Sequence, residues 1–93
     1  HVVANRQLLQ HYLQPLLERE LISGAIPAAG CTYFPKIMFD QAHIEHVAQK
    51  TGCVPGRFFG SAYQQHLRIG FGGPSNLIEA ALKAFTQTIL TLE

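Results

Sequence analysis

The sequence predicts a domain of the α/β class, an α+β two-layer sandwich in which helices cover a small mixed or antiparallel sheet. Amphipathic helical patterns occupy both ends of the chain, and segments with strand character lie between them. The resulting order of helix, strand, helix, strand, strand, helix favours two layers around one core. A chain of 93 residues has room for a single core of this kind.

The first helix is expected over residues 4–22, where apolar residues recur at steps of three and four. Pro15 lies inside this pattern and lacks a backbone donor, so we expect it to kink the helix or to divide it in two. Residues 23–30, rich in breakers, are expected to form a loop. The apolar stripe consists of Leu8, Leu9, Tyr12, Leu13, Leu16, Leu17 and Leu21.

A strand is predicted over residues 31–37, which are aromatic and β-branched, and Pro35 indicates an edge position or an early end. A second helix follows, with Asp40 as its N-terminal cap and Gly52 at its end. The apolar side of this helix is formed by Phe39, Ile44, Val47 and Ala48.

Residues 53–54 are expected to form only a brief strand, because the Pro-Gly pair at 55–56 demands a turn, and residues 57–65 continue as a loop. Residues 66–71 alternate between apolar and other types, which is the period of a strand with one buried face. The side chains of Leu67, Ile69 and Phe71 are expected on the buried face, and those of His66, Arg68 and Gly70 on the other.

The last helix is predicted to open at Ser75 or Asn76. It is amphipathic and follows a glycine-rich turn, in which the lysine and the spacing of a phosphate-binding loop are absent. Its apolar positions are Leu77, Ile78, Ala81, Leu82, Phe85, Ile89 and Leu90.

Composition excludes several classes of protein. The formal net charge of +1 lacks the electrostatic footprint of a nucleic-acid binder. The apolar runs are too short for a membrane span, and no export signal is visible. Two widely spaced cysteines, Cys31 and Cys53, favour reduced thiols in a cytoplasmic protein. The chain opens with His1 rather than methionine, so we expect it to be a piece of a longer protein.

Three segments carry a family resemblance: GCTYFPKI at 30–37, GCVPGRFFG at 52–60 and HLRIGFG at 66–72. The residues of these segments, their order and their spacing resemble those of the C-terminal small domain of class I and II aminotransferases. These are the fold-type I enzymes that depend on pyridoxal phosphate (PLP). The resemblance covers nearly all of residues 1–93 and is strongest from 30 to 90. It implies that the chain is the small-domain fragment of an enzyme whose large PLP-binding domain is absent here.

The resemblance further implies that Arg68 binds the carboxylate of the amino-acid or 2-oxo-acid substrate when the amino group is transferred between them. A guanidinium suits this role because its planar fork donates two parallel charge-assisted hydrogen bonds to a carboxylate. Gly70 lies two residues along on the same strand face and leaves room for a ligand. Without the family resemblance, an ordinary surface ion pair would be the favoured interpretation of Arg68.

PLP chemistry needs a lysine that forms a Schiff base with the cofactor. Lys36, Lys50 and Lys83 do not match the family's cofactor-lysine motif, and the resemblance implies that the catalytic and cofactor-binding residues belong to the large domain. We therefore expect the fragment alone to hold no PLP and to be inactive. The parent is expected to be a homodimer, whose large domain is the partner of this chain.

Other candidate sites are weaker. His43 and His46 are three residues apart on one helix, but no third ligand is near in sequence, so no metal is predicted. Phe58 and Phe59 either face the substrate cleft or the large domain, or pack under their loop, and packing is favoured; Tyr63 is undecided between these positions. Three alternative functions stay open: a PLP-dependent C–S lyase, an aminotransferase-like transcription regulator, and a non-catalytic α/β binding module.

Overall fold

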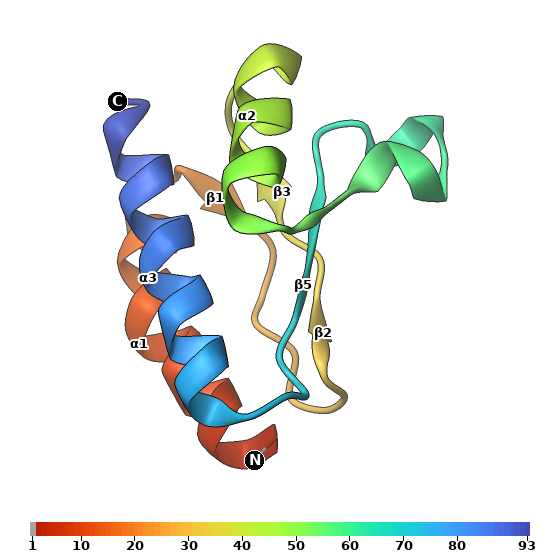
Figure 1. Ribbon diagram of the computed structural model, residues 1–93. Coiled ribbons are helices and arrows are strands. Elements are labelled where there is room, and N and C mark those ends of the chain that lie inside the picture. The colour runs from red at the N-terminus through yellow and green to blue at the C-terminus, as the bar shows by residue number, and fades with distance from the viewer. Residues whose placement is uncertain (1) are drawn as a thin grey trace.

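Residues 2–93 are described by a computed structural model, in which the helices at the two ends of the chain lie side by side against short strands (Figure 1). The helices are α1 (Val2–Glu18), α2 (Gln41–Thr51) and α3 (Ser75–Thr91). The strands are β1 (Ile22–Ser23), β2 (Thr32–Tyr33), β3 (Lys36–Ile37), β4 (Val54–Pro55) and β5 (Leu67–Gly70). Two 3₁₀ turns, η1 (Gly56–Phe59) and η2 (Ser61–Tyr63), lie between β4 and β5.

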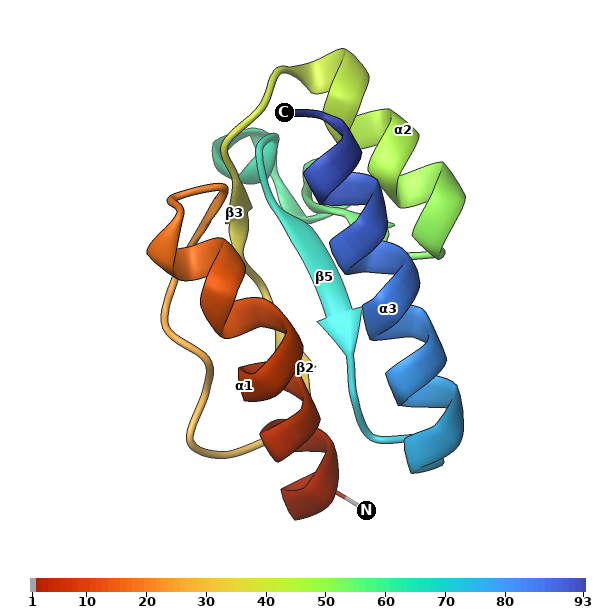
Figure 2. The ribbon, with the colours of Figure 1, turned by 90° about the vertical axis from the view of Figure 1, so that its left-hand side faces the viewer.

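Strand β5 is the centre of an antiparallel sheet with β2 on one side and β4 on the other. β1 and β3 form a second antiparallel pair, which a bridge between Lys36 and His66 connects to β5. Helices α1 and α3 lie side by side over one face of the sheet, and α2 packs beside α3 (Figures 1 and 2). The predicted α+β sandwich is therefore confirmed.

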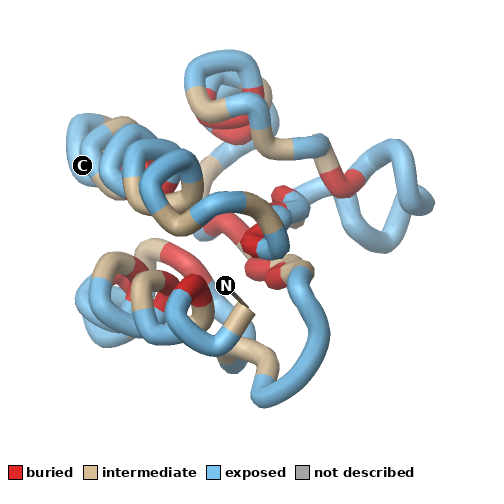
Figure 3. The backbone as a smooth tube through the Cα atoms, turned by 60° about the horizontal axis from the view of Figure 1, so that its bottom comes forward, coloured by how far each residue is buried: buried red, intermediate tan, exposed pale blue. Residues whose placement is uncertain are grey.

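The core lies between the helices and the sheet, where buried positions of both layers face one another (Figure 3). β5 alternates as predicted, since Leu67, Ile69 and Phe71 are buried while Arg68 and Gly70 are exposed. The helices contribute Leu9, Leu13, Leu16, Ile44, Val47, Ala48, Leu82, Phe85 and Ile89 to this core. The other face of the sheet is consequently the one that can meet a ligand.

The first helix differs from its prediction in its end, and Pro15 does not divide it. It continues through Pro15 without division, and the Arg19 amide donates to the Pro15 carbonyl over 3.1 Å. His11 and Pro15 are exposed, so water can bond the carbonyl that the proline leaves unpaired. The helix ends at Glu18 instead of Ile22, because Ile22 pairs with Ile37 in β1 and β3.

In the middle of the chain the caps of α2 are as predicted, but the single strand predicted over residues 31–37 is wrong. The predicted strand 31–37 is two strands, β2 and β3, separated at Phe34 and the buried Pro35. Asp40 caps α2 as predicted, its carboxylate accepting from the His43 amide over 3.0 Å. Gly52 ends this helix in the left-handed region, with φ of 74°.

Helix α3 begins at Ser75 as predicted, but two of its predicted core leucines are wrong. Leu77 and Leu90 are exposed, and the buried stripe of α3 consists of Leu82, Phe85 and Ile89. None of the helices within residues 2–93 combines the length and apolarity needed to cross a membrane.

Candidate functional site

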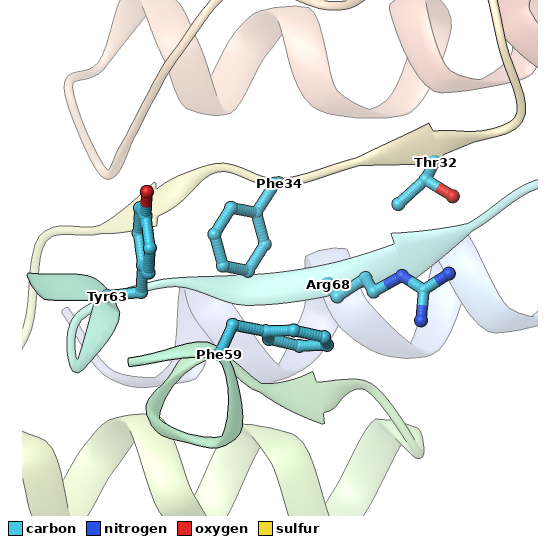
Figure 4. A pocket seen from close by; sticks show the side chains of 5 residues that line it. All are labelled: Thr32, Phe34, Phe59, Tyr63 and Arg68. Atoms are coloured by element: carbon cyan, nitrogen blue, oxygen red, sulfur yellow. The ribbon is translucent and has the colours of Figure 1, made fainter. Parts of the chain in front are cut away.

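A pocket of about 290 Å³ opens on the exposed face of the sheet (Figure 4). Strand residues form one side of it, and η1 and η2 form the other. Its lining residues are Thr32, Phe34, Phe59, Tyr63 and Arg68. In Figure 4 the Arg68 side chain extends away from Phe34 and Tyr63, so its guanidinium lies at the Thr32 end of the pocket. The pocket therefore has a charged end and an aromatic end.

The pairing of the strands explains why these residues meet. Thr32 lies opposite Gly70 in the ladder between β2 and β5. Because side chains alternate across a sheet, continuing this register places Phe34 opposite Arg68 on the same exposed face. On the other side of β5, Val54 pairs with Arg68. Arg68 is thus the central side chain of the open face.

Arg68 is exposed, and within residues 2–93 it takes part in neither an ion pair nor a side-chain hydrogen bond. Its guanidinium carbon lies 5.8 Å from the centre of the Phe59 ring, a cation–π distance. The Arg68 side chain also borders a second hollow of about 410 Å³ on the β4 side, which it shares with Thr51, Gly52, Cys53, Val54, Ile69, Gly70 and Ala81. The arginine predicted to bind substrate is therefore accessible and lacks a competing carboxylate.

Phe34 is the hub of an aromatic cluster at the other end. Its ring centre lies 5.7 Å from that of Phe59, 5.4 Å from that of Tyr63 and 4.9 Å from that of His66. The Phe59 pair is edge-to-face, and the His66 ring stacks on Phe34. Such contacts stabilise a rigid apolar wall.

The position of the aromatic wall depends on Gly56, whose backbone lies close to that of Tyr63 and His66. The Gly56 amide donates to the His66 carbonyl over 2.8 Å, and a Cβ at position 56 would lie 2.2 Å from the carbonyl oxygen of Tyr63. Arg57 continues the anchoring, because its Nε donates to the carboxylate of Glu45 in α2 over 2.6 Å. The Pro-Gly turn predicted at 55–56 thus brings η1 and η2 back over β5.

The predicted packing of Phe58 and Phe59 under the loop is wrong. Phe58 is 64% exposed, Phe59 47% and Tyr63 42%. Phe59 and Tyr63 line the pocket, whereas Phe58 stacks with Arg57, whose guanidinium carbon lies 4.3 Å from its ring centre. The loop is anchored by backbone bonds and the Arg57–Glu45 pair, so it does not need to bury these rings.

The pKa values of His66 and Tyr33 are both shifted in the direction that favours the neutral form. Burial, together with the charge of nearby Lys36, lowers the pKa of His66 below its ordinary value. The Nδ1 atom of His66 is buried without a hydrogen-bond partner among the described residues. Under the sheet, burial raises the pKa of Tyr33 to about 12, and its hydroxyl donates to the Gly24 carbonyl. Arg68 is therefore the cation that lines the pocket.

Asn5 holds the end of β5 from the helix layer. It is fully buried, and its amide donates 2.8 Å bonds to the carbonyls of Phe71 and Gly73. Its own oxygen accepts from the Ser75 hydroxyl over 2.7 Å. Sequence reasoning missed Asn5, although the signal was present: a polar residue one turn before Leu9 on the apolar stripe.

The remaining candidates stay apart from the pocket. His43 and His46 are exposed on α2, and His43 contacts Asp40. Residues 2–93 contain no cluster of three or more side chains suited to hold a metal ion. Lys50 and Lys83 are exposed on helices, and Lys36 is half-buried beside His66 without lining the pocket.

The sequence matches no protein-family model, and a search of curated proteins finds no significant relative.

Proposed function

We propose that this chain is the small domain of a fold-type I PLP-dependent aminotransferase, in which Arg68 binds the carboxylate of the amino acid and of the 2-oxo acid. One observation carries the proposal beyond the sequence resemblance. Arg68 is exposed at one end of an otherwise uncharged pocket, and no acidic residue within residues 2–93 pairs with it. The guanidinium is therefore free to bind the carboxylate of a ligand.

The residues around Arg68 favour the binding of a small anion to its guanidinium. The apolar ring of Phe59 reduces the access of water to one side of the guanidinium, which strengthens a charge-assisted hydrogen bond. The hydroxyl of Thr32 at the same end is a further donor for a carboxylate oxygen. Gly70 leaves open space beside the arginine, since a Cβ there would meet nothing within 4 Å.

The lysines of residues 2–93 do not fit the role of the PLP lysine, because none of them lines the pocket. When bound in the parent enzyme, PLP supplies the electron sink for amino-group transfer. This chain's part is to bind the substrate carboxylate, to orient it, and to help exclude water from the cleft.

The first test is a titration of the 93-residue chain with pyruvate and with L-alanine, followed by the amide and Arg side-chain signals in NMR spectra. We expect saturable shifts around residues 32, 59 and 68, which Arg68→Gln abolishes and Arg68→Lys weakens. The matched control is Arg19→Gln, because Arg19 is paired with Glu93 and does not line the pocket. If Arg68→Gln binds pyruvate as the wild type does, the role of Arg68 is wrong.

The second test uses this chain joined to its PLP-binding domain and follows the cofactor's absorbance during titration with amino acids. Loss of a charge-assisted contact of about 1.5–3 kcal/mol predicts that Arg68→Gln needs roughly ten to a hundred times more amino acid. Product analysis separates the related activities, since a C–S lyase releases a thiol, a 2-oxo acid and ammonia, whereas an aminotransferase passes the amino group to a 2-oxo acid and forms a new amino acid. A parent that ignores PLP would contradict the proposal.

A further inference from the structure

The pocket joins two different chemistries over a short distance. At one end lies the unpaired guanidinium of Arg68 with the Thr32 hydroxyl beside it. At the other end the rings of Phe34, Phe59 and Tyr63 form a continuous apolar wall. A ligand that satisfies both ends carries one carboxylate and a flat apolar body.

We propose that the ligand of this pocket is an aromatic amino acid or the corresponding aromatic 2-oxo acid, with its carboxylate on Arg68 and its ring against the aromatic wall. This inference rests on the proposed function, because it assumes that Arg68 binds the substrate carboxylate. It goes further by naming the side chain of the substrate.

The exposure of the aromatic wall favours a ligand that carries an aromatic ring. Phe59 and Tyr63 are 47% and 42% exposed, although the rings of both contact Phe34. Aromatic pairs favour edge-to-face and offset contacts with centres about 4.5–7 Å apart, and the three rings are arranged with such spacings. A further ring can contact Phe34 and Phe59 in the same way and remove apolar surface from water.

The charge pattern argues against a dicarboxylate. Arg68 is the cation among the residues that line this pocket. Lys36 lies beside His66 and does not line the pocket. A second carboxylate would therefore meet Phe34 and Tyr63 and lose its hydration without gaining a partner.

The size of the pocket is consistent with one ligand of amino-acid dimensions. Its volume of about 290 Å³ lies just below the range of roughly 300–1,000 Å³ that is usual for small-molecule sites. Tyr63 brings a hydroxyl to the aromatic end, which can bond a polar substituent on the ring.

The test compares the binding of pyruvate, 4-methyl-2-oxopentanoate, phenylpyruvate and 2-oxoglutarate to the 93-residue chain by NMR titration. The decisive variants are Phe59→Leu and Phe58→Leu. These neighbours are both exposed, but only Phe59 lines the pocket. Arg68→Gln reports separately on the carboxylate end.

We expect phenylpyruvate to bind about two- to tenfold more tightly than pyruvate, the range expected for an added aromatic contact. Phe59→Leu should remove most of this preference, so that the ratio of phenylpyruvate to pyruvate affinity falls toward one, and Phe58→Leu should leave that ratio unchanged. Equal binding of pyruvate and phenylpyruvate, or a preference for 2-oxoglutarate, overturns the aromatic assignment. If Arg68→Gln still weakens every probe in that case, the proposed function stands; if it weakens none, the proposed function falls as well.

Discussion

The side-chain amide of Asn5, in the second turn of α1, donates a buried hydrogen bond to the carbonyl of Phe71 at the end of β5. This bond joins residues that are 66 positions apart in the chain. Phe71 lies three residues after Arg68, so the bond fixes the strand on which the proposed ligand-binding side chain stands. The helix layer thereby helps to fix the position of the open face of the sheet, because it is bonded to the backbone next to β5.

Asn5→Ala should lower the free energy of unfolding by about 2–4 kcal/mol, because it leaves the carbonyls of Phe71 and Gly73 without their donor. Ser75→Ala should cost less, since it removes one bond to Asn5 and leaves both carbonyls paired. Urea unfolding followed by circular dichroism measures both. Gln7→Ala on the exposed side of α1 is the control and should stay within about 0.5 kcal/mol of the wild type. Equal stabilities of Asn5→Ala and Gln7→Ala would contradict the role of Asn5.

Gly56→Ala should destabilise the protein and open the pocket. The new Cβ would lie 2.2 Å from the Tyr63 carbonyl oxygen, and this neighbour is backbone, which cannot rotate away. Overpacking of this kind costs about 1–3 kcal/mol or more. NMR spectra should show shifts concentrated at Phe59 and Tyr63. Gly70→Ala is the control, and similar spectra for the two variants would show that the close approach at Gly56 has no effect on the pocket.

Local features of the chain predict the parts of the site that depend on one element. The alternation of residues 66–71 is sufficient to turn Arg68 outward, because a strand with one buried face leaves no other choice. Asp40 and Gly52 likewise predict the two ends of α2, because helix capping involves only neighbouring residues. These predictions needed no knowledge of the tertiary structure.

Features that depend on pairing between distant segments were not predictable in this way. Phe34 reaches the pocket because β2 pairs with β5 in one register, and a slip of one residue would turn it to the buried face. Leu77 is exposed although it belongs to the apolar pattern of α3, because the helical period does not show which apolar positions meet another layer of the fold. Asn5 is polar at an apolar position, and only the fold reveals the carbonyls that it serves.

Gly70 tests whether a ligand occupies the space beside Arg68. Its backbone does not require positive φ and its surroundings are open, so Gly70→Ala should raise the free energy of unfolding by about 0.4–1 kcal/mol. Gly70→Val should also keep the fold, because β-branched residues suit strands. Its methyl groups should nevertheless weaken pyruvate binding severalfold by crowding the guanidinium. Unchanged binding by Gly70→Val would move the ligand away from this side of Arg68.

Asp40 should make the stability of the protein depend on acid pH. The backbone amide of His43, and then its side chain, lower the pKa of the Asp40 carboxyl, so the folded state binds this proton less readily than the unfolded state. The contribution is complete above the unfolded pKa of about 4 and is lost as the pH falls further. Asp40→Asn keeps a good cap but cannot titrate, so its thermal midpoint should fall less between pH 5 and 3 than that of the wild type.

His66 should give a second pH dependence, at higher pH and close to the pocket. Burial and the charge of Lys36 lower its pKa, so the folded state binds this proton less readily than the unfolded chain, whose histidine titrates near pH 6.5. Stability should be complete above about pH 6.5 and should decrease as the pH falls toward the folded pKa. Protonation would also place a donor on the buried Nδ1, which has no partner among residues 2–93. Thermal unfolding between pH 8 and 5, together with an NMR titration of the imidazole, measures both effects.

The variants His66→Gln and Lys36→Gln separate the two causes. His66→Gln removes the titration, so the decrease in stability between pH 7 and 5 should become smaller. Lys36→Gln removes only the repulsion, so the pKa of His66 should rise toward its ordinary value and the slope should become shallower without disappearing. Because the His66 ring stacks on Phe34 at 4.9 Å, its protonation should also shift the Phe34 ring signals. An imidazole that titrates at its ordinary pKa, with Phe34 unaffected, would show that His66 is solvated and is not part of the wall.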